Sequence, residues 1–277
     1  VANAPETASG RASVAEDLAL IRDAAEEAGR IALSYFHGHR EMDVRMKGGN
    51  SPVSAGDLAA DTYLRKVLMT ARPDYGWLSE ESADISQTRR QTAPRSFIVD
   101  PIDGTRNFAS GKPPFGIIVA RADGGVARSG WIYDCLTGRF CTAHLGSGAF
   151  IDGERIVARP TGKTPPVAAL SLIFMQETRR EATRRHISPA YDLVDIPYCA
   201  AEQYPRLALG ENDVSIFERT LAWDHAAGVL WLNEAGGKAA RPDGSPYRVD
   251  EVGRTGLLGA ASPVLWDELA DLYARLD

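Results

Sequence analysis

The strongest constraint on the fold is a series of three short apolar segments between Phe115 and His144. Residues 116–120, 127–133 and 139–143 are rich in apolar side chains, and turns that contain Gly separate them. Segments of this kind, joined by a few turn residues, are typical of consecutive antiparallel strands. The spacing therefore predicts an antiparallel meander in the middle of the chain.

Helical periodicity occurs on both sides of this meander. Residues 13–36 carry apolar side chains at helical spacing, and Ser13 with Glu16 forms a capping-box pattern. Further helices are predicted over residues 55–69, 176–186, 223–235 and 263–276. Further strands are predicted at residues 77–79, 96–99, 167–174 and 193–196. This mixture predicts an α/β (α+β) fold built in layers, with a subdomain boundary near Pro160.

Charge and composition exclude several classes of function. The net charge is −6 and no run of Lys or Arg occurs, which argues against binding of extended nucleic acid. Cys135, Cys141 and Cys199 have no metal-type spacing, which predicts small buried side chains in a reducing compartment. No window approaches the roughly 20 apolar residues of a membrane span. Residues 1–11 lack the apolar region of a signal peptide, so a cytoplasmic location is expected.

Two carboxylates follow an apolar strand in the most informative segment. Asp100 ends the apolar run, and Pro101 cannot continue it as a member of a central ladder. Asp103 comes three residues later on the same turn, so both carboxylates can converge on one point. Gly104 lets the backbone approach a ligand closely, and if Gly104 and Thr105 open a helix, their N–H groups face an anion such as phosphate.

Other acidic residues occupy comparable positions. Glu80 and Glu81 follow an apolar run, and Asp224 follows an apolar–aromatic pair at a helix start. Each taken alone is more often a helix cap, a turn residue or a solvated charge. Together with Asp100 they favour a shared site, because neighbouring anions repel unless a cation lies between them, and hard oxygen ligands select Mg²⁺.

Five segments resemble, in order, the inositol monophosphatase superfamily of Mg²⁺-dependent, lithium-sensitive phosphatases. Residues 100–108 read D-P-I-D-G-T-R-N-F and resemble its D-P-I-D-G-T-x-N-F signature. Residues 223–237 resemble its second signature. Residues 78–82 resemble its glutamate motif, residues 47–57 the loop before its catalytic aspartate, and residues 146–153 a further family arrangement. The resemblance therefore covers most of the chain.

This resemblance implies a layered α/β/α/β/α sandwich of the sugar-phosphatase type. An N-terminal α+β subdomain over residues 1–158 would carry most metal ligands. A C-terminal α/β subdomain over residues 159–277 would complete the metal site and the substrate pocket. The resemblance also implies a homodimer.

The resemblance further implies a site for two or three Mg²⁺ ions. Glu80, Asp100 and the carbonyl group of Ile102 would hold the first ion. Asp100, Asp103 and Asp224 would hold the second, with Asp100 as the bridging ligand. Glu80 could also face a weaker third ion. On this basis Glu80 is counted among the catalytic residues as well as among the metal ligands.

The resemblance also implies that catalysis depends on a hydroxyl–carboxylate pair. Thr105 and Asp57 would polarise the attacking water, and the backbone amides of Gly104 and Thr105 would steady the phosphoryl oxygens. The chain departs from the family pattern at two further positions, where Ser54 and Arg106 stand in place of Thr. Both changes leave the predicted metal ligands in place.

A larger departure concerns substrate recognition. Residues 198–210 occupy the place of a Gly-Ser-Ala-type substrate motif but lack its Gly and Ser. Glu218 is the candidate for the substrate-recognising glutamate, although its spacing is one residue off. Arg206 or Arg219 could meet a second anionic group, and Asp103 is a further predicted substrate contact.

The predicted function is Mg²⁺-dependent hydrolysis of a small phosphate monoester, an inositol or sugar phosphate, by metal-activated water. Two alternatives within the family stay open, a histidinol-phosphate phosphatase and a 3′(2′),5′-bisphosphate nucleotidase. The run at 204–206 faintly resembles the nucleotidase branch. An alternative of another class is a non-enzymatic regulatory binding protein on the same scaffold. The expected partner is a small phosphorylated metabolite, with no extended nucleic acid and no membrane.

Overall fold

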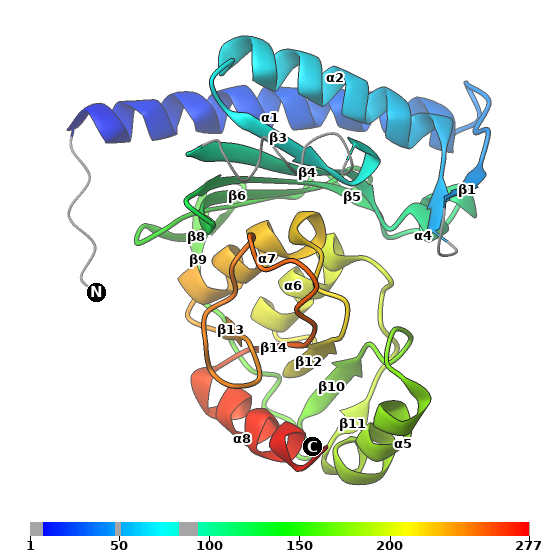
Figure 1. The fold of residues 1–277 in the computed structure, drawn as a ribbon, viewed down its shortest axis with the longest axis vertical. Coiled ribbons are helices and arrows are strands. Elements are labelled where there is room, and N and C mark those ends of the chain that lie inside the picture. Colours follow the sequence, from blue (N-terminus) through cyan, green and yellow to red (C-terminus); the bar gives the residue numbers. More distant parts are fainter. Residues whose placement is uncertain (1–7, 48–50, 83–93, 277) are drawn as a thin grey trace.

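The computed structural model describes residues 8–47, 51–82 and 94–276. Its α-helices are α1 (Ala8–Phe36), α2 (Ala55–Ala71), α4 (Thr105–Ala109), α5 (Glu177–His186), α6 (Ala200–Ala208), α7 (Ala222–Glu234) and α8 (Pro263–Tyr273). Figure 1 shows α1 and α2 above a seven-stranded sheet, α6 and α7 between this sheet and a five-stranded sheet, and α5 and α8 below. The predicted α/β/α/β/α sandwich is therefore confirmed.

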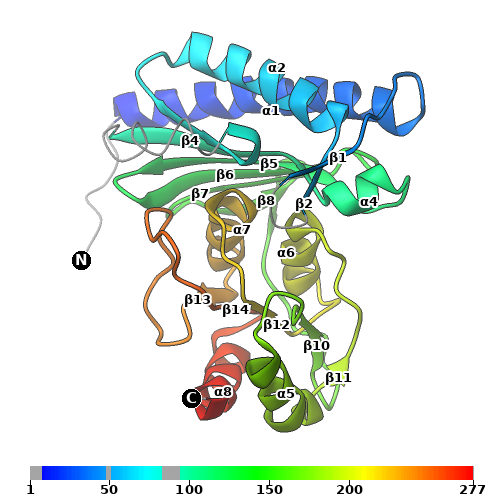
Figure 2. The ribbon, with the colours of Figure 1, turned by 45° about the vertical axis from the view of Figure 1, so that its right-hand side comes forward.

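The seven-stranded sheet follows the chain in the order β3-β4-β5-β6-β7-β8-β9. Its strands are β3 (Gly76–Ser79), β4 (Arg95–Asp103), β5 (Gly116–Asp123), β6 (Val126–Asp134), β7 (Phe140–His144), β8 (Gly148–Ile151) and β9 (Glu154–Ile156). β3 and β4 pair in parallel, and every later pair is antiparallel. The meander predicted between Phe115 and His144 is confirmed as β5, β6 and β7. Figure 2 shows its strands edge-on beneath α1 and α2.

The five-stranded sheet has the order β11-β10-β12-β14-β13. Its strands are β10 (Val167–Leu170), β11 (Asp192–Leu193), β12 (Val214–Phe217), β13 (Lys238–Ala240) and β14 (Leu257–Ala260). β10 is parallel to β11 and β12, whereas β14 is antiparallel to both of its neighbours. The predicted strand at 167–174 ends four residues early. β12, β13 and β14 are absent from the predictions, because apolar runs of three or four residues do not show a strand period.

Short elements connect the layers. A hairpin of β1 (Arg45–Lys47) and β2 (Ser51–Val53) precedes α2. Single 3₁₀ turns follow β3, α5 and α8, namely η1 (Glu80–Ser82), η2 (Ser188–Ala190) and η3 (Ala274–Leu276). The chain passes from the larger to the smaller sheet between β9 and β10. The predicted boundary at residue 158 falls in this connection, and the division into two subdomains stays a prediction.

Two helices differ from the sequence-based expectations. α1 begins at Ala8, five residues before the predicted start. The capping-box interpretation of Ser13 is therefore wrong, because Ser13 lies inside the helix, where Ala8, Ala12 and Ala15 favour helix formation. α6 is absent from the predictions, because Pro205 lies inside it and a Pro normally ends a helix.

The core fills the spaces between the layers. One buried cluster lies between α1, α2 and the seven-stranded sheet, a second between that sheet and α7, and a third between the five-stranded sheet and α8. The three Cys side chains are buried and free of disulfides, as predicted. α7 packs very closely on β6, where a Cβ atom added to Gly130 would lie 2.9 Å from the Cα atom of Ala227. Among the described residues, no helix is both long and apolar enough to cross a membrane.

Candidate active site

The strand β4 brings two carboxylates to the space between the sheets. Its pairing with β3 stops at Val99, and its register with β5 shifts between Asp100, opposite Ile118, and Asp103, opposite Gly116. Two residues of β4 therefore oppose one residue of β5, which is a β-bulge. Pro101 lies in this bulge, as its missing N–H predicts, although the strand resumes beyond it.

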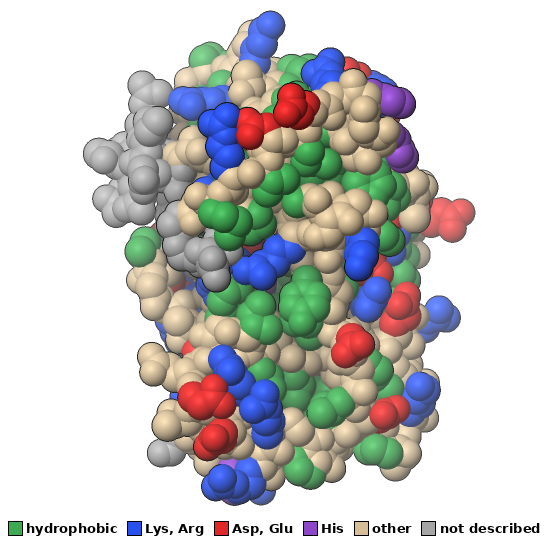
Figure 3. Space-filling view, turned by 90° about the vertical axis from the view of Figure 1, so that its right-hand side faces the viewer, with side chains coloured by type: hydrophobic (Ala, Val, Ile, Leu, Met, Phe, Trp, Pro, Cys, Tyr) green, Lys and Arg blue, Asp and Glu red, His purple; other side chains and the backbone are tan. Residues whose placement is uncertain are grey.

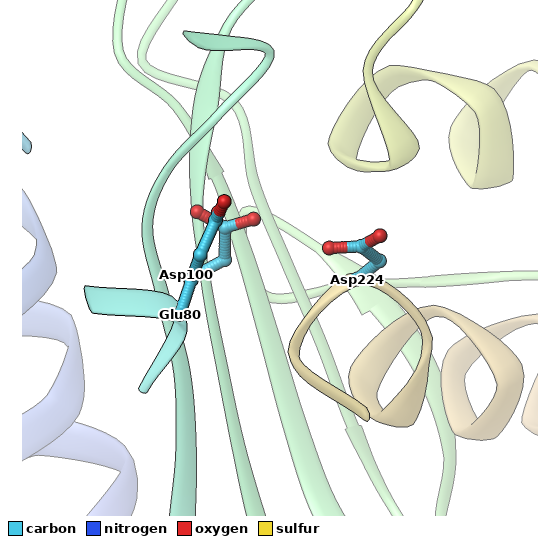
Figure 4. Close-up of side chains that lie close together, drawn as sticks. All are labelled: Glu80, Asp100 and Asp224. Atoms are coloured by element: carbon cyan, nitrogen blue, oxygen red, sulfur yellow. The ribbon is translucent and has the colours of Figure 1, made fainter. Parts of the chain in front are cut away.

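Three acidic side chains from separate elements converge beside this bulge. Glu80 begins η1 directly after β3, Asp100 lies on β4, and Asp224 lies in the first turn of α7. One carboxylate oxygen of each lies within 4.8 Å of the others. Figure 4 shows Asp224 pointing across the gap toward Glu80 and Asp100. The structure therefore brings together the acids of three separated sequence motifs.

Burial and mutual repulsion raise the pKa values of these acids. Burial is the largest cause for Asp100, whose side chain is 1% exposed, and the charges of Glu80, Asp103 and Asp224 raise its pKa further. Burial also raises the pKa of Asp224, and Glu80 and Asp103 add to the increase. The pKa of Glu80 is raised chiefly by burial, with Lys47 opposing. The cluster therefore resists full ionisation on its own.

The cations near the cluster compensate only part of this charge. The Lys47 ammonium group is 2.5 Å from Glu81 and 3.7 Å from Glu80. The Arg219 guanidinium group is 3.7 Å from Asp224, which is beyond hydrogen-bonding distance. The Glu81 carboxylate is therefore already paired with a cation of the protein itself. Burial raises the pKa of Glu81 to about 7, with Lys47 opposing.

The donor set fits a hard divalent cation. Buried carboxylates that repel one another gain more from a divalent cation than isolated surface acids do, and oxygen donors match the preference of Mg²⁺. Glu80 and Asp224 each keep 16% of their side-chain area exposed, so the cluster remains accessible. The Ile102 carbonyl oxygen and Asp57 Oδ1 are alternative acceptors for the single hydrogen of the Thr105 hydroxyl group, at 3.0 Å and 3.2 Å, so the carbonyl oxygen keeps at least one lone pair for a cation.

Asp103 lies beside the three-acid cluster rather than within it. Its Oδ2 atom accepts hydrogen bonds from the backbone N–H of Ala201 (2.6 Å) and from the Cys199 thiol (3.1 Å). These bonds connect β4 to the start of α6. Burial is the largest influence on the pKa of Asp103 and raises it, while these hydrogen bonds oppose the shift.

The predicted hydroxyl–carboxylate pair is within hydrogen-bonding distance. The Thr105 Oγ1 atom lies 3.2 Å from Asp57 Oδ1. The other carboxylate oxygen of Asp57 accepts bonds from the Ser54 backbone N–H (2.9 Å) and hydroxyl group (2.5 Å). Ser54 is also the N-cap of α2, so the same capping box begins the helix and fixes the Asp57 carboxylate. Burial raises the pKa of Asp57, and the bonds from Ser54 and Thr105 oppose the shift.

Gly104 occupies a position that requires glycine. Its φ is 84°, and a Cβ atom there would lie 2.9 Å from the Pro114 carbonyl oxygen and 3.2 Å from the Cys199 side chain. Glycine at this position therefore allows the backbone to pass close to neighbouring protein atoms, whereas the sequence-based expectation was a close approach to a ligand. Gly104 is the N-cap of the short helix α4, so the predicted helix start at Gly104 and Thr105 is present.

A pocket of about 170 Å³ contains this cluster and extends between the two sheets. Of the predicted substrate contacts, Gly104, Thr105, Asp103 and Glu218 line it. Arg206 does not line it, because its guanidinium group is engaged by Glu202 (2.9 Å) on the same helix. The substrate role of Arg206 therefore stays a prediction that the pocket lining does not support. The alternative cation, Arg219, does line the pocket.

Several lining residues have no counterpart in the sequence-based site. The structure adds Phe174, Tyr198, Gln203 and His225 to the pocket. His225 is buried, with Nδ1 2.8 Å from the Tyr204 hydroxyl and Nε2 3.0 Å from the Arg219 carbonyl oxygen. Burial lowers the pKa of His225 to about 3. Tyr198 and Gln203 lie in the segment at 198–210 and His225 lies in the second signature, but no local pattern indicates that these side chains face the pocket, because their convergence depends on how α6 and β12 pack.

Comparison of substitutions at two capping serines is expected to distinguish an effect on stability from an effect on catalysis. Ser54→Ala and Ser262→Ala each remove the N-cap of a helix, α2 and α8 respectively, and each is expected to lower the free energy of unfolding by about 1 kcal/mol. Only Ser54 contacts Asp57, so only Ser54→Ala should also lower kcat. Denaturant titration and steady-state kinetics measure both effects, and equal kinetic losses in the two variants would contradict the role of Ser54.

Magnesium is expected to stabilise the protein more at pH 8 than at pH 5.5. Because the folded-state pKa values of Asp100 and Asp224 are raised, the metal-free folded protein binds more protons than the unfolded chain above about pH 4. Its free energy of unfolding therefore falls as the pH rises through the raised pKa values. A cation that replaces these protons therefore increases the free energy of unfolding most at high pH. Thermal unfolding with and without Mg²⁺ tests this, and equal increases in Tm at both pH values would refute it.

Fold and site together define the class, a layered α/β protein with a candidate site for divalent cations between its sheets. The sequence profile described as "Inositol monophosphatase family" matches residues 14–275. The chain therefore belongs to the inositol monophosphatase family.

Named relatives span more than one activity. The chain is 33% identical to an inositol-1-monophosphatase of Rhizobium meliloti (strain 1021), over 79% of this chain and 82% of the relative. It is 30% identical to a histidinol-phosphatase of Chlorobaculum parvum, over 80% of this chain and 84% of the relative. Among solved structures, the extragenic suppressor protein suhB of Bartonella henselae matches with a TM-score of 0.80 and 25% identity, over 94% of this chain and 99% of that chain.

Proposed function

We propose that the protein hydrolyses a small phosphate monoester with the help of Mg²⁺. The observation that supports this most strongly is the convergence of Glu80, Asp100 and Asp224 in one pocket, next to the Thr105–Asp57 pair. Cation ligands therefore line one small-molecule site together with Thr105, whose hydroxyl group connects the pocket to Asp57. Membership of the inositol monophosphatase family supports the same reaction.

The acids divide between two cation positions in this proposal. Glu80, Asp100 and the Ile102 carbonyl group would hold one Mg²⁺ ion, and Asp100, Asp103 and Asp224 would hold the second. When bound, Mg²⁺ supplies charge stabilisation for the phosphoryl group and lowers the pKa of the attacking water. Asp100 contributes to both positions, which makes it the most consequential single ligand.

The Thr105–Asp57 pair would position the attacking water and accept its proton. When the Thr105 hydroxyl group donates to Asp57 Oδ1, the lone pairs of Thr105 Oγ1 are available to accept a hydrogen bond from water. As the water attacks phosphorus, its proton passes to Thr105 and the Thr105 proton passes to Asp57, while the bond between phosphorus and the ester oxygen breaks. The leaving alkoxide takes a proton from solvent water and departs as the alcohol, and Asp57 returns its proton to solvent. Ser54 holds the second oxygen of Asp57 and so keeps the carboxylate in place. The backbone N–H groups of Gly104 and Thr105 are proposed donors to the phosphoryl oxygens.

The alcohol part of the ester would extend toward Glu218 and Arg219. Both residues line the pocket on the side of β12. Arg219 replaces Arg206 in this proposal, because Arg219 lines the pocket and Arg206 does not. Relatives named inositol-1-monophosphatase and histidinol-phosphatase make inositol 1-phosphate and histidinol phosphate the first two test substrates.

A panel of monoesters tests the proposal directly. Release of phosphate is measured from inositol 1-phosphate, a sugar phosphate, histidinol phosphate and a 3′-phosphorylated adenosine nucleotide, each with and without Mg²⁺. We expect turnover of at least one ester with Mg²⁺ only, and inhibition by Li⁺. Absence of turnover throughout the panel, with folded protein and Mg²⁺ present, would favour the non-enzymatic binding role.

A further inference from the structure

A cation and an aromatic ring follow two neighbouring strands of the five-stranded sheet. β10 and β12 pair in parallel, so the segments that follow them leave the same edge of the sheet. Phe174 follows β10 and Arg219 follows β12, and both side chains line the pocket. The Arg219 guanidinium carbon lies 4.2 Å from the centre of the Phe174 ring. The ring therefore supports the cation at a sheet edge of the kind where α/β proteins commonly bind ligands.

The backbone at Arg219 is held by buried side chains. His225 Nε2 lies 3.0 Å from the Arg219 carbonyl oxygen, and the His225 side chain is buried. The next residue, Thr220, accepts a hydrogen bond from the buried Arg241 guanidinium group (2.9 Å). The Thr220 hydroxyl group itself donates to the Arg254 carbonyl oxygen (2.6 Å). The starting point of the Arg219 side chain is therefore fixed relative to the pocket.

The turn that carries Phe174 is fixed in a similar way. The Arg180 guanidinium group donates to the carbonyl oxygens of Leu172 (3.1 Å) and Met175 (3.0 Å), which lie on either side of Phe174 in the sequence. Three residues of helix α5 separate Arg180 from its start at Glu177, so the turn is attached to a regular element. The ring therefore has a defined position against which the guanidinium group can stack.

The Arg219 guanidinium group is available to a ligand. Its side chain is 41% exposed, and its Nη2 atom is 3.7 Å from Asp224 Oδ2, which is beyond hydrogen-bonding distance. Within the described part of the chain, its five N–H groups donate no hydrogen bond to the protein. On the face shown in Figure 3, Lys or Arg side chains lie next to hydrophobic side chains at mid-height. A charged donor with unused N–H groups therefore lies beside the candidate cation site.

We propose that Arg219 stabilises the negative charge that develops on the ester oxygen as the alcohol leaves, and that Phe174 positions the guanidinium group for this role. The inference rests on the proposed phosphatase function and adds a catalytic residue on its leaving-group side. The attacking and leaving oxygens of a phosphoryl transfer lie roughly in line, on opposite sides of phosphorus. Thr105 follows β4 of the larger sheet, whereas Arg219 follows β12 of the smaller sheet. A water held by Thr105 therefore expels the alcohol toward Arg219.

The step requires no proton from Arg219. When the bond between phosphorus and the ester oxygen breaks, its electron pair stays on the oxygen and gives an alkoxide. A guanidinium group is not deprotonated in proteins, so it acts on the alkoxide as a cation and a hydrogen-bond donor, and solvent water supplies the proton. The stabilisation increases with the charge on the ester oxygen. It is therefore largest for esters of weakly acidic alcohols.

Three esters with similar rings test this dependence on the leaving group. They are benzyl, phenyl and 4-nitrophenyl phosphate. An alkyl alcohol has a pKa close to that of water, about 16, and phenol has a pKa of about 10, which a nitro group lowers further. At saturating Mg²⁺, Arg219→Met is expected to lower the single-turnover rate for benzyl phosphate by about 10²-fold and that for 4-nitrophenyl phosphate by less than about threefold, with phenyl phosphate between them. An equal loss with all three esters would overturn the proposal.

Substitutions of Phe174 test its positioning role. Phe174→Leu removes the ring and should lower the rate for benzyl phosphate by about fivefold, with little change for 4-nitrophenyl phosphate. Phe174→Tyr keeps the ring and should keep the rate. The double variant Phe174→Leu/Arg219→Met should lose no more than Arg219→Met alone, because the ring acts through the cation. Multiplying losses in the double variant would contradict the assignment of Phe174 as a positioning residue.

A second arginine on an aromatic ring provides the matched control. The Arg22 guanidinium carbon lies 4.5 Å from the centre of the Phe140 ring, its side chain is also 41% exposed, and it does not line the pocket. Arg22→Met should therefore change none of the three rates. A loss as large as that of Arg219→Met would show a general effect of removing a surface cation and overturn the proposal.

Titration with Mg²⁺ separates the leaving-group role from an effect on the cation site. Calorimetry should show that Arg219→Met binds Mg²⁺ as tightly as the wild type or more tightly, because a positive charge beside Asp224 is removed. Weaker binding would assign the loss of rate to the cation site and overturn the proposal. If the wild type hydrolyses none of the esters with Mg²⁺ present, the phosphatase function is refuted as well, whereas a uniform loss in Arg219→Met from an active wild type refutes the leaving-group role alone.

Discussion

Asp100→Asn is expected to lower kcat/KM by at least about 10³-fold. The substitution keeps the shape of the side chain but removes the charge that both proposed cation positions share. Cation stabilisation of a phosphoryl transition state contributes several kcal/mol, and about 4 kcal/mol corresponds to a thousandfold change in rate. Steady-state kinetics at saturating Mg²⁺ measures the loss, and calorimetric titration with Mg²⁺ measures the accompanying loss of affinity.

The same variant should be more stable than the wild type when Mg²⁺ is absent. Asp100 is buried among like charges, and its neutral replacement removes repulsion from Glu80, Asp103 and Asp224. The metal-free Tm should therefore rise while the Mg²⁺-dependent increase in Tm shrinks. Asp134→Asn is the matched control, because Asp134 lies outside the pocket lining, where it accepts backbone N–H bonds from Leu136 and Thr137 and lies 4.0 Å from the Arg139 guanidinium group. Near-normal turnover by Asp100→Asn would contradict the bridging role.

Thr105→Ala is expected to lower kcat by about 10²-fold or more while Mg²⁺ affinity stays close to that of the wild type. General acid–base assistance contributes about 10²–10⁴-fold, and this variant removes the hydroxyl group between the water and Asp57. Thr105→Ser keeps the hydroxyl group and should recover most of the rate. Single-turnover kinetics and Mg²⁺ titration together separate the chemical step from cation binding.

A second threonine hydroxyl group provides the control for this experiment. Thr62 donates only to the Leu58 carbonyl oxygen on the exposed side of α2, so Thr62→Ala should leave kcat unchanged. A collapse of Mg²⁺ affinity in Thr105→Ala would show that the hydroxyl group acts through the cation site. It would then be wrong to assign Thr105 to proton transfer.

The parts of the site that the sequence predicts are those with a strong local pattern. The apolar run before Asp100 predicts β4, and the missing N–H of Pro101 predicts the interruption in its ladder. The three motifs that contain Glu80, Asp100 and Asp224 each place an acid at the end or the start of a regular element. The layered order of elements is enough to bring such ends together in one cleft.

Other parts of the site depend on contacts between distant segments. No local pattern indicates that the Asp103 carboxylate meets the start of α6, or that Lys47 engages Glu81. Arg206 faces Glu202 because the two residues occupy i,i+4 positions on α6. This helix could not be predicted from the sequence, because Pro205 lies inside it. The contact between Ser54 and Asp57 could have been predicted from the sequence, because a Ser followed three residues later by an Asp is the spacing of a capping box.

The tight packing of α7 on β6 has a consequence for the width of the cation site. Asp224 is in the first turn of α7, whereas Glu80 and Asp100 are attached to the seven-stranded sheet, so the distance between helix and sheet determines how far apart these acids stand. Gly130 permits this distance by presenting only a hydrogen atom to Ala227. The absence of a side chain at Gly130, which is remote from the reacting groups, thus helps to set the distance between Asp224 and the two acids attached to the sheet.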